Sequence, residues 1–480
     1  MNGRRIRIMY RNRRCLEPLF YPGKAHGFLC APARAGKFRD VLAQILMSAG
    51  GAGRGLTGAP YSLLMVDIKG QGCAVTHRQR KKSGKVFRLD PFNLMERLPG
   101  VEECPPLARV DPMKRLDPLS KTFGADCDNL TEALVPHDAH GESYWVNAAR
   151  KLGSGMTMLQ KTYWPEKTLV DVYHTIAGPE LQLVAQDAMP GGPLWSSRPE
   201  HQFIVDRLAF AATAEPGDKH FQSVVSTATV AMGFMGNACI ADSLSGSTLE
   251  PEDLTREPIT VYLILPGEYL GGNTSNWFRL MSGCFVDAVM RSTHRSVQVL
   301  GLLDEFKSAV GRLGVIETAM GLAAGYGLQL LPVFQNLSQL QELNPQGWET
   351  FLANSGFRIF FAPRDKTTSD YISDMAGVSS VRGFSCSMGI RPDGGLSMNV
   401  GSSSQERRCF MPHETRYNLG QDEALVFGDF PGKGGFIRAG RRPYYEPDAQ
   451  GCNEWAGMYD PDPYEYMATQ EQKHGGGMAG

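Results

Sequence analysis

The chain has 480 residues, of which 42% are hydrophobic and 21% charged, and its formal net charge at pH 7 is −1. This length predicts two or three domains. The neutral balance excludes a uniformly basic nucleic-acid binder without excluding a local basic channel. The ten cysteines form no CxxC pair, so the sequence favours a reducing compartment over a zinc site or a disulfide framework.

The N-terminal end is basic. Six arginines lie among the first 14 residues and no apolar core follows them, so this end does not resemble a signal peptide. We interpret residues 1–22 as a solvated basic segment. The longest apolar runs have the length of strands and fall short of the roughly 20 residues that cross a bilayer. The sequence therefore predicts a protein without a membrane span.

A glycine loop follows the first buried strand that the sequence predicts. Residues 28–30 are apolar, residues 31–37 read APARAGK, and residues 38–47 have the apolar spacing of a helix. A strand, a tight glycine loop and a lysine at a helix N-terminus can cradle a phosphate with backbone amides. An ordinary strand-to-helix turn has the same pattern, so the loop alone leaves both interpretations open.

Two more strands follow, and then the pattern changes. Residues 61–68 predict a buried strand that ends around Asp67, and residues 85–89 predict a third strand. Between about residues 118 and 220 the strand patterns disappear. Helical patterns occupy residues 129–135, 143–160, 168–176, 179–187 and 201–212. We therefore predict an all-helical insertion in an α/β domain.

The α/β pattern returns after the insertion. Strands are predicted for residues 259–265, 297–303, 328–334, 357–361, 424–427 and 435–438, and helices for residues 277–290, 314–324 and 368–375. Residues 379–400 are rich in serine and glycine and indicate a hairpin, and residues 470–480 indicate a disordered tail. Strands that alternate with helices imply a parallel sheet with helices on both faces, which binds ligands at the C-terminal ends of its strands.

The strand at residues 297–303 delivers two adjacent carboxylates, Asp304 and Glu305, at its C-terminal end. A nucleotide-hydrolysing sheet presents a Mg²⁺-associated aspartate and a water-activating glutamate in this way. A core strand that ends at a polar turn would look the same. The order of a phosphate cradle followed by paired acids favours a nucleotide site over both ordinary interpretations.

Taken in order, these motifs resemble those of TraG-like coupling ATPases of type IV secretion and conjugation systems. The resemblance rests on APARAGK, VDIKGQ with the later LDPF, LLDEF, AGYGLQL, FQNLSQL, FLANSGFRIFFAPRDKTTSDYIS, and RRPYY at residues 441–445. It covers residues 23–445 and implies an α/β fold, a RecA-like P-loop nucleotide-binding domain with an inserted all-α domain. The expected division is a basic segment at 1–22, the nucleotide-binding domain at 23–117 and 221–465, the all-α insertion at 118–220, and a disordered tail at 466–480.

The resemblance also implies roles for individual residues. Lys37 would hold the β- and γ-phosphates of ATP. Asp304 would hold Mg²⁺ through water, Glu305 would polarise the attacking water, and Gln335 would sense the γ-phosphate or orient water. The phosphate cradle would consist of Ala31, Pro32, Ala33, Arg34, Ala35, Gly36, Lys37 and Phe38.

Some positions depart from the family pattern. Phe38 stands where standard phosphate loops carry a Ser or Thr hydroxyl for Mg²⁺, a place where the family often has glycine. Ile68 follows Asp67 where the family usually has proline, and Gln71 replaces a glutamate. Family members also usually begin with membrane helices, whereas here only about 22 residues precede the similar region, and they are basic rather than apolar. These departures predict weak hydrolysis, or binding without fast turnover, and docking through a separate membrane-anchoring partner or a divergent apparatus.

Basic side chains carry two further expectations. The resemblance implies an arginine finger offered to a neighbouring subunit, for which Arg358 and Arg364 are candidates, although such arginines are more often ordinary surface or ion-pair residues. A basic run within HRQRKKSGK would face either DNA in a ring interior or water. Its side chains are Arg78, Arg80, Lys81 and Lys82.

The implied function is that of a type IV coupling ATPase. It would assemble as a homo-hexamer, use ATP and Mg²⁺, recruit a relaxase or relaxosome with single-stranded DNA, or a protein substrate, and deliver it to the channel ATPases and inner-membrane components. Its expected place is the bacterial cytoplasm, peripheral at the cytoplasmic face of the inner membrane. Two alternatives stay open: a hydrolysis-deficient nucleotide-binding adaptor and a free DNA translocase.

Overall fold

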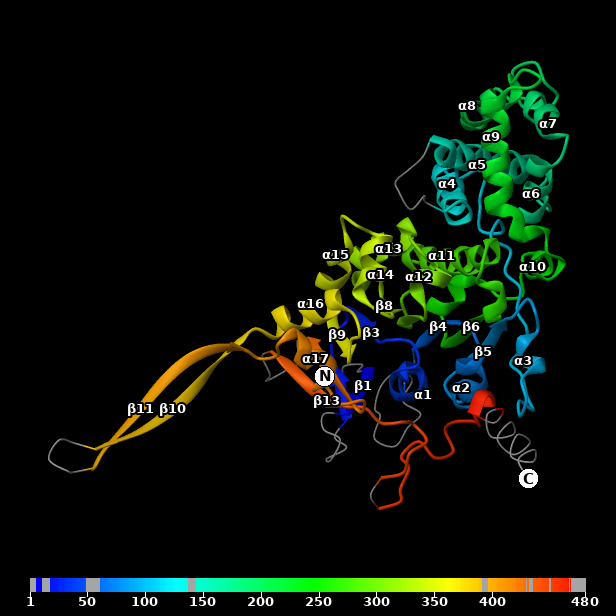
Figure 1. Ribbon diagram of the computed structural model, residues 1–480. Coiled ribbons are helices and arrows are strands. Elements are labelled where there is room, and N and C mark those ends of the chain that lie inside the picture. Colours follow the sequence, from blue (N-terminus) through cyan, green and yellow to red (C-terminus); the bar gives the residue numbers. More distant parts are fainter. Residues whose placement is uncertain are drawn as a thin grey trace, which may run out of the picture.

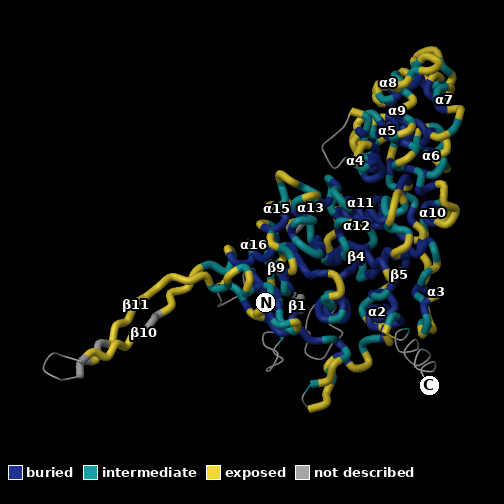
Figure 2. The backbone as a smooth tube through the Cα atoms, in the orientation of Figure 1, coloured by how far each residue is buried: buried dark blue, intermediate teal, exposed yellow. Residues whose placement is uncertain are grey.

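The computed structural model describes residues 6–10, 18–48, 61–136, 144–390, 396–428, 430, 435–448, 450–465 and 467. Three parts are visible in Figure 1: a body built on a large sheet, a helical lobe above it, and a two-stranded arm that extends to one side. Figure 2 shows that buried residues concentrate in the body and inside the lobe, whereas the arm is exposed.

The body is organised around an 11-stranded sheet with the order β2-β1-β13-β12-β9-β3-β8-β7-β4-β6-β5. The parallel strands are β3 (His26–Cys30), β4 (Ser62–Asp67), β5 (Lys85–Leu89), β6 (Ile259–Ile264), β7 (Val299–Leu303), β8 (Leu328–Phe334) and β9 (Ser355–Phe361). The antiparallel edge consists of β1 (Ile6–Tyr10), β2 (Pro18–Tyr21), β12 (Glu423–Gly428) and β13 (Phe436–Gly440). All residues of β4, β7 and β8 are buried, which is why these strands have continuous apolar sequences instead of alternating ones.

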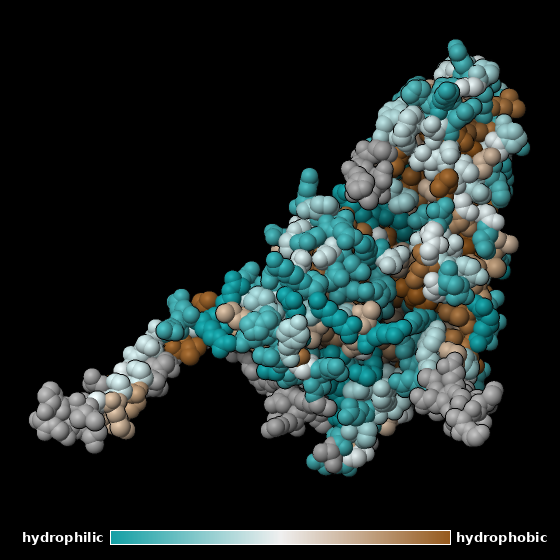
Figure 3. Space-filling model, in the orientation of Figure 1, coloured by the Kyte–Doolittle hydropathy of each residue, from teal (hydrophilic) through white to brown (hydrophobic). Residues whose placement is uncertain are grey.

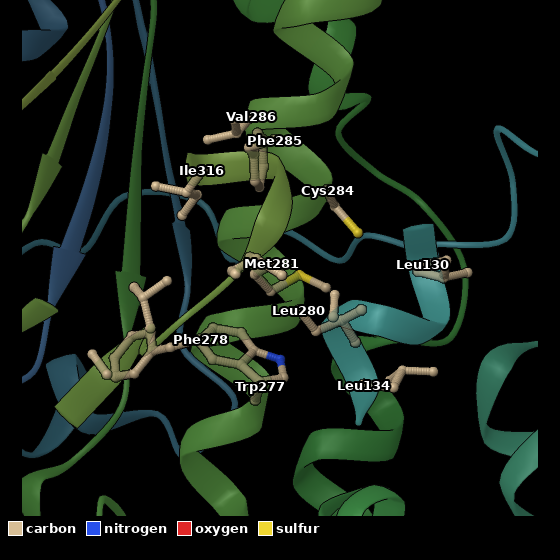
Figure 4. Packing of buried hydrophobic residues seen from close by; sticks show 14 of the residues in the cluster. Leu130, Leu134, Trp277, Phe278, Leu280, Met281, Cys284, Phe285, Val286 and Ile316 are labelled. Carbon is tan, nitrogen blue, oxygen red and sulfur yellow. The ribbon is translucent and has the colours of Figure 1, made fainter. Parts of the chain in front are cut away.

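Helices cover both faces of this sheet. Leu63 of β4 belongs to the core that includes α1 (Ala43–Ser48) and α2 (Gln71–Lys81), whereas its neighbour Leu64 belongs to the core that includes α11 (Asn276–Arg291). Figure 4 shows this second core around α11. The remaining helices of the body are α3 (Leu94–Arg97), α12 (Phe306–Ala309), α13 (Gly314–Leu322), α14 (Leu337–Leu343), α15 (Trp348–Ala353), α16 (Lys366–Ala376) and α17 (Pro412–Tyr417).

Strands β1 and β2 correct the expectation of a solvated basic segment for residues 6–10 and 18–21, whereas residues 1–5 and 11–17 lie outside the described part of the chain. The two strands pair with each other, with Ile6 opposite Tyr21, and β1 also joins β13. Met9, Leu19 and Tyr21 are buried. Arg7 in β1 weakened this strand signal, because a strand of an antiparallel sheet needs only one apolar face and tolerates charge on the other.

The helical lobe starts with α4 (Phe123–Leu134), which packs against α11 (Figure 4). The helices that follow are α5 (Tyr144–Tyr163), α6 (Leu169–Ala177), α7 (Leu181–Asp187), α8 (Pro199–Ala212), α9 (Lys219–Met232) and α10 (Ala238–Ser243). The predicted patterns did not include α9 and α10. Helix α9 is rich in Val, Thr and Ser, which have low intrinsic helix propensity, but Asp218 caps it by accepting a hydrogen bond from His220 N at 2.8 Å. Because the expected boundary at residue 220 falls inside α9, we propose that the insertion extends to residue 243.

The arm consists of β10 (Val378–Ile390) and β11 (Leu396–Arg408), which pair antiparallel from Val378 opposite Arg408 to Ile390 opposite Leu396. The hairpin predicted at residues 379–400 is confirmed, and it extends further at its base. Serine and glycine weaken the alternation that marks a strand, so the sequence indicated the hairpin without its full length.

The surface of the body is largely polar. Figure 3 shows hydrophilic colours over most of its visible face, with hydrophobic patches on the lobe and where the lobe meets the body. In the part of the chain that the structure describes, no helix combines the length and the apolar character needed to cross a membrane.

His26, the first residue of β3, gives the fold a pH dependence that can be measured. Its Nδ1 accepts a hydrogen bond from Leu330 N at 3.0 Å, and burial lowers the pKa of His26 from its ordinary 6.5 to about 4. As the pH falls, His26 is therefore protonated in the unfolded chain before it is protonated in the folded chain. The contribution of His26 to the free energy of unfolding is fully present above pH 6.5 and is lost as the pH drops to 4. We expect His26 to account for a loss of about 3 kcal/mol in unfolding free energy between pH 7 and pH 4.

Urea unfolding at both pH values checks this expectation. The variant His26→Gln should lack this part of the loss, whereas the control His294→Gln, which changes an exposed histidine, should retain it. An equal loss in wild type and His26→Gln would contradict the prediction.

Candidate active site

The phosphate loop predicted at residues 31–37 crosses the C-terminal edge of the sheet directly after β3. Ala31 N donates to the carbonyl of Phe334 on β8 at 2.9 Å, so the loop begins as a continuation of the strand pairing. Two residues with left-handed backbone, Arg34 (φ 59°) and Gly36 (φ 85°), then turn the chain into the helix that continues as α1. A side chain at Gly36 would be strained at that φ, which explains the glycine.

The predicted acids stand on the same edge of the sheet. Asp304 and Glu305 follow the end of β7, and Lys37 Nζ lies 2.8 Å from Oδ1 of Asp304 and also forms an ion pair with Oε1 of Glu305. Gln335, at the end of β8, donates from Nε2 to Oε2 of Glu305 at 2.9 Å. The strand order β3-β8-β7 therefore brings Lys37, Asp304, Glu305 and Gln335 into one contact network.

Glu305 has an unusual backbone in this network. Its φ of 48° is left-handed, which is uncommon for a residue other than glycine, and its N–H donates to Oδ1 of Asp304 at 2.9 Å. Backbone strain of this kind is concentrated at functional sites, where the surrounding structure maintains it. The turn points both neighbouring carboxylates toward Lys37.

Burial and mutual charge set the protonation of the network. Burial lowers the pKa of Lys37, but the carboxylates of Asp304 and Glu305 outweigh this effect and the net pKa is raised, so the lysine stays an ammonium. Burial raises the pKa of Asp304, against the lowering effect of Lys37. On the neighbouring strand β4, burial raises the pKa of Asp67 to about 7, and its Oδ2 accepts from Cys73 N at 2.8 Å. Lys37 thus lies beside two acids, Asp304 and Glu305, and the charge of Asp304 also acts on Asp67, which is a setting suited to a divalent cation with a phosphate.

These residues fit a magnesium–nucleotide pair without forming a metal cage of their own. Among the described residues, no group of three or more His, Cys, Asp and Glu side chains could hold a metal ion. Mg²⁺ commonly keeps several waters and takes one or two carboxylates together with phosphate oxygens. Asp304 beside the phosphate loop is a donor of that kind.

Phe38 places its side chain outside this network. It is 9% exposed and packs into the core that includes α1, with its ring edge against Tyr444 at a centroid distance of 6.4 Å. The position after Lys37 therefore supplies packing where other phosphate loops supply a hydroxyl to Mg²⁺.

The two candidate arginine fingers have different surroundings. Arg358 on β9 lies against α16, with Nη1 3.5 Å from the hydroxyl oxygen of Tyr371. Arg364 follows β9 and lines a cavity of about 660 Å³ that also includes Pro32 and Ala35 of the phosphate loop. Within one chain, Arg364 therefore lies beside its own loop and Arg358 does not. The other arginines that line this cavity are Arg34, Arg39, Arg416 and Arg441.

One residue of the predicted basic run cannot contact DNA. Arg80 is buried, with Nε donating to Thr260 Oγ1 at 2.9 Å and Nη2 donating to the carbonyl of Tyr61 at 2.9 Å. Helix α2 turns one face toward the sheet, and Arg80 lies on that face, so the DNA-facing expectation is wrong for this residue. The exposed residues of the run are Arg78, Lys81 and Lys82.

Two residues that contact the loop were missing from the predicted set. The Arg441 guanidinium donates to Oδ2 of Asp40 at 2.7 Å and to the carbonyl of Ala35. The motif RRPYY marked Arg441 through the resemblance but gave it no role. Nothing in the local sequence singles out Asp40, because its importance comes from a partner about 400 residues away.

Comparison with known proteins decides the family. The model of a family described as type IV secretory system conjugative DNA transfer matches residues 4–449. The chain belongs to this family. Two relatives are protein VirD4 of Rhizobium radiobacter, 26% identical over 420 residues, and conjugal transfer protein TraG of Escherichia coli, 22% identical over 419 residues. These matches cover 85% and 81% of this chain but only 55% and 60% of the relatives, so the chain spans little more than half their length.

Solved structures of the bacterial conjugative coupling protein TrwB share the fold of this family member. An unbound form has a TM-score of 0.63 at 14% identity and covers 95% of this chain and 92% of its own. A complex with ADP and Mg²⁺ has a TM-score of 0.60 at 13% identity and covers 94% and 91%. The prediction of a RecA-like nucleotide-binding fold with an all-α domain is thereby confirmed.

Proposed function

We propose that this chain is an ATPase that couples ATP hydrolysis to the delivery of DNA or protein substrates to a type IV secretion channel in conjugative transfer. The observation that carries the proposal is the contact network of Lys37, Asp304, Glu305 and Gln335 across three adjacent strands. Membership of a conjugative DNA transfer family supports the process, and the TrwB complex with ADP and Mg²⁺ supports the cofactors.

Each residue of the network has its own task. Without nucleotide, Lys37 neutralises the two acids; with ATP bound, its ammonium turns to the β- and γ-phosphates, which the loop amides cradle. Glu305 accepts a proton from the water that attacks the γ-phosphorus while the bond from that phosphorus to the bridging oxygen breaks. Gln335 already contacts Glu305 and is placed to orient the same water. The products are ADP and phosphate.

Magnesium, when bound, offsets the charge of the phosphate oxygens. With Glu305 assigned as the base, Asp304 is the other acid that pairs with Lys37. Asp304 would therefore hold the water shell of the ion. Because Phe38 offers no hydroxyl to the ion, we expect turnover to be slower than with a Ser or Thr at this position.

The cavity beside the loop bears on the two candidates for the arginine finger. Arg364 lines it together with Pro32 and Ala35, whereas its lining includes no residue of the contact network around Lys37. We therefore propose Arg364 as the candidate for a finger offered to a neighbouring subunit. Arg358 stays a less favoured candidate because it lies against α16.

For assembly and location, we propose a ring of six copies on the cytoplasmic side of the inner membrane of a bacterium. Its partners would be a relaxase or relaxosome with single-stranded DNA, the channel ATPases, the inner-membrane components and a separate membrane-anchoring partner. The all-α insertion would meet the substrate, and the exposed residues of the basic run would meet DNA. Family membership supports these partners as a class.

ATP turnover by the purified chain, measured with and without single-stranded DNA, tests the proposed function. We expect Mg²⁺-dependent phosphate release that DNA stimulates, because a motor couples ATP hydrolysis to the movement of its bound substrate. Binding of ATP with no turnover in either condition would reject the motor. The absence of ATP binding would reject both the motor and any nucleotide-dependent role.

A hydrolysis-deficient adaptor is the second candidate, and Phe38 is the observation that favours it. Such a protein would retain the fold and bind a relaxase with the same affinity in the presence and absence of nucleotide. Robust turnover would eliminate it. A free translocase would instead displace DNA strands without any secretion partner.

A further inference from the structure

The motif RRPYY, residues 441–445, has no part in the proposed hydrolysis, yet it lies against the phosphate loop. The segment after β13 passes beneath α1 in the view of Figure 1. Nε and Nη2 of Arg441 lie 3.0 Å and 2.7 Å from Oδ2 of Asp40, and Nη2 also donates to the carbonyl of Ala35. The two charged side chains are only 5% and 1% exposed. One buried guanidinium therefore ties the loop to the helical turn that follows it.

The Arg441 side chain is itself held in place. Its Cζ lies 3.7 Å from the ring centroid of Phe361 at the end of β9, an arrangement that favours a cation over the ring face. Its backbone N donates to the carbonyl of Asp422 at 2.7 Å. The guanidinium thus has a fixed position, set by the neighbouring strand and by its own backbone, from which it contacts the loop.

Tyr444 contacts the residues that directly follow the loop. Its ring meets the edge of Phe38 at 6.4 Å, and its N lies 3.3 Å from the carbonyl oxygen of Arg39, to which it donates. The carbonyl of Arg442 accepts from Nε2 of Gln44 at 2.7 Å. The residue that departs from the usual phosphate loop, Phe38, is therefore one of the residues that this motif contacts.

The ion pair has a geometric consequence for phosphate binding. Buried ion pairs are weak sources of net stability, because the cost of desolvation offsets their attraction. In a trans peptide, however, the C=O and N–H groups point in opposite directions. Holding the Ala35 carbonyl toward Arg441 therefore holds the Gly36 N–H in the same peptide plane, pointing away from Arg441 on the opposite side of the C–N bond. That N–H is one of the amides expected to cradle a phosphate.

We propose that residues 441–445 form a positioning element for the phosphate loop. Arg441 sets the peptide plane between Ala35 and Gly36, and Tyr444 anchors Phe38, so that the loop has its binding shape before a nucleotide arrives. The effect on affinity rests on the proposed nucleotide binding. The effect on loop rigidity does not, and it can be measured without any ligand.

Three variants separate positioning from simple stability. Arg441→Lys retains the charge, but a single ammonium lacks the planar fork that spans Asp40 and Ala35. Arg441→Met combined with Asp40→Leu removes both charges of the buried pair, so that neither is left uncompensated. Arg39, which also pairs with Asp40, loses that partner, but its side chain is 40% exposed and water can solvate its charge. Arg438→Met is the matched control, because this arginine lies three residues earlier on β13 and bonds Glu423 and the carbonyl of Asn418, away from the loop.

Amide hydrogen exchange of peptides that cover residues 31–42 is the first readout, in the full chain without nucleotide. We expect exchange to be about tenfold faster in Arg441→Lys and in the double variant, the size set by one lost hydrogen bond to a charged group, and unchanged in Arg438→Met. Exchange within about twofold of wild type in the double variant would overturn the proposal, since tenfold corresponds to 1.4 kcal/mol.

Equilibrium binding of a fluorescent ATP analogue with Mg²⁺ is the second readout. We expect the same two variants to bind about tenfold more weakly than wild type and the control. If amide hydrogen exchange in the loop becomes faster but the affinity for the ATP analogue is unchanged, the claim that the motif prepares the loop for phosphate is overturned. If wild type does not bind the analogue, the proposed function fails, while the exchange measurement still decides whether Arg441 sets the loop.

Discussion

Replacing Lys37 with alanine is expected to weaken Mg²⁺-ATP binding at least about 100-fold. The change removes charge-assisted hydrogen bonds to phosphate oxygens, each worth roughly 1.5–3 kcal/mol. It also leaves Asp304 and Glu305 without the ammonium that now neutralises them, so two carboxylates would repel the incoming phosphates. Equilibrium binding of a fluorescent ATP analogue measures the effect directly.

Lys307→Ala is the matched control for this experiment. Lys307 lies on α12, close in sequence to the acid pair, but its side chain pairs with Glu342 at the surface. Among the contacts that the structure describes, this side chain has no ion pair with Asp304 or Glu305. Its removal should leave ATP affinity within about twofold, as expected for a surface ion pair. Wild-type affinity in Lys37→Ala would reject the assignment of residues 31–38 as the phosphate cradle.

Replacing Glu305 with glutamine is expected to reduce ATP turnover about 10³-fold while ATP affinity changes little. The amide has the shape of the carboxylate and can remain near Gln335, but it cannot take the proton from the attacking water, a task worth roughly 10²–10⁴-fold. Removing one negative charge beside the phosphates also favours ATP binding. Phosphate release and analogue binding, measured on the same preparation, separate the two effects.

Glu342→Gln provides the comparison, because Glu342 is an exposed acid whose partner is Lys307. It should hydrolyse ATP at the wild-type rate. Undiminished turnover in Glu305→Gln would show that another group accepts the proton. Turnover lost in Glu305→Gln but present in wild type would also eliminate the adaptor, because an adaptor has no hydrolysis to lose.

Much of the fold could be predicted because its signals are local. Strands buried on both faces, such as β7 and β8, are continuous apolar runs, and their signal survives without knowledge of their neighbours. Elements with weaker local signals were missed or shortened. Helix α9 has a β-branched sequence that packing and a capping aspartate stabilise, and β1 and β2 pair at an edge where arginines are tolerated.

The candidate site divides in the same way. Lys37 could be proposed from the glycine loop that it closes, Asp304 and Glu305 from their place at the end of a buried strand, and Gln335 from the family resemblance. The environment of Phe38 could not be predicted, since the ring of Tyr444 comes from a distant segment. The burial of Arg80 could not be predicted either, because a basic run looks solvated until the face that meets the sheet is known.

By itself, the sequence determined which residues end the buried strands and which loop can cradle a phosphate, because hydrophobic period and loop chemistry act over a few residues. Only the tertiary structure decided that β8 lies between β3 and β7, and therefore that Lys37 and Gln335 both reach Glu305. It also decided that Arg441 contacts Ala35 of the loop and Asp40 of the helical turn that follows it. The physical reason is that strands pair through backbone groups common to all residues, so their order is set by the packing of all helices and faces at once, and no short segment contains that information.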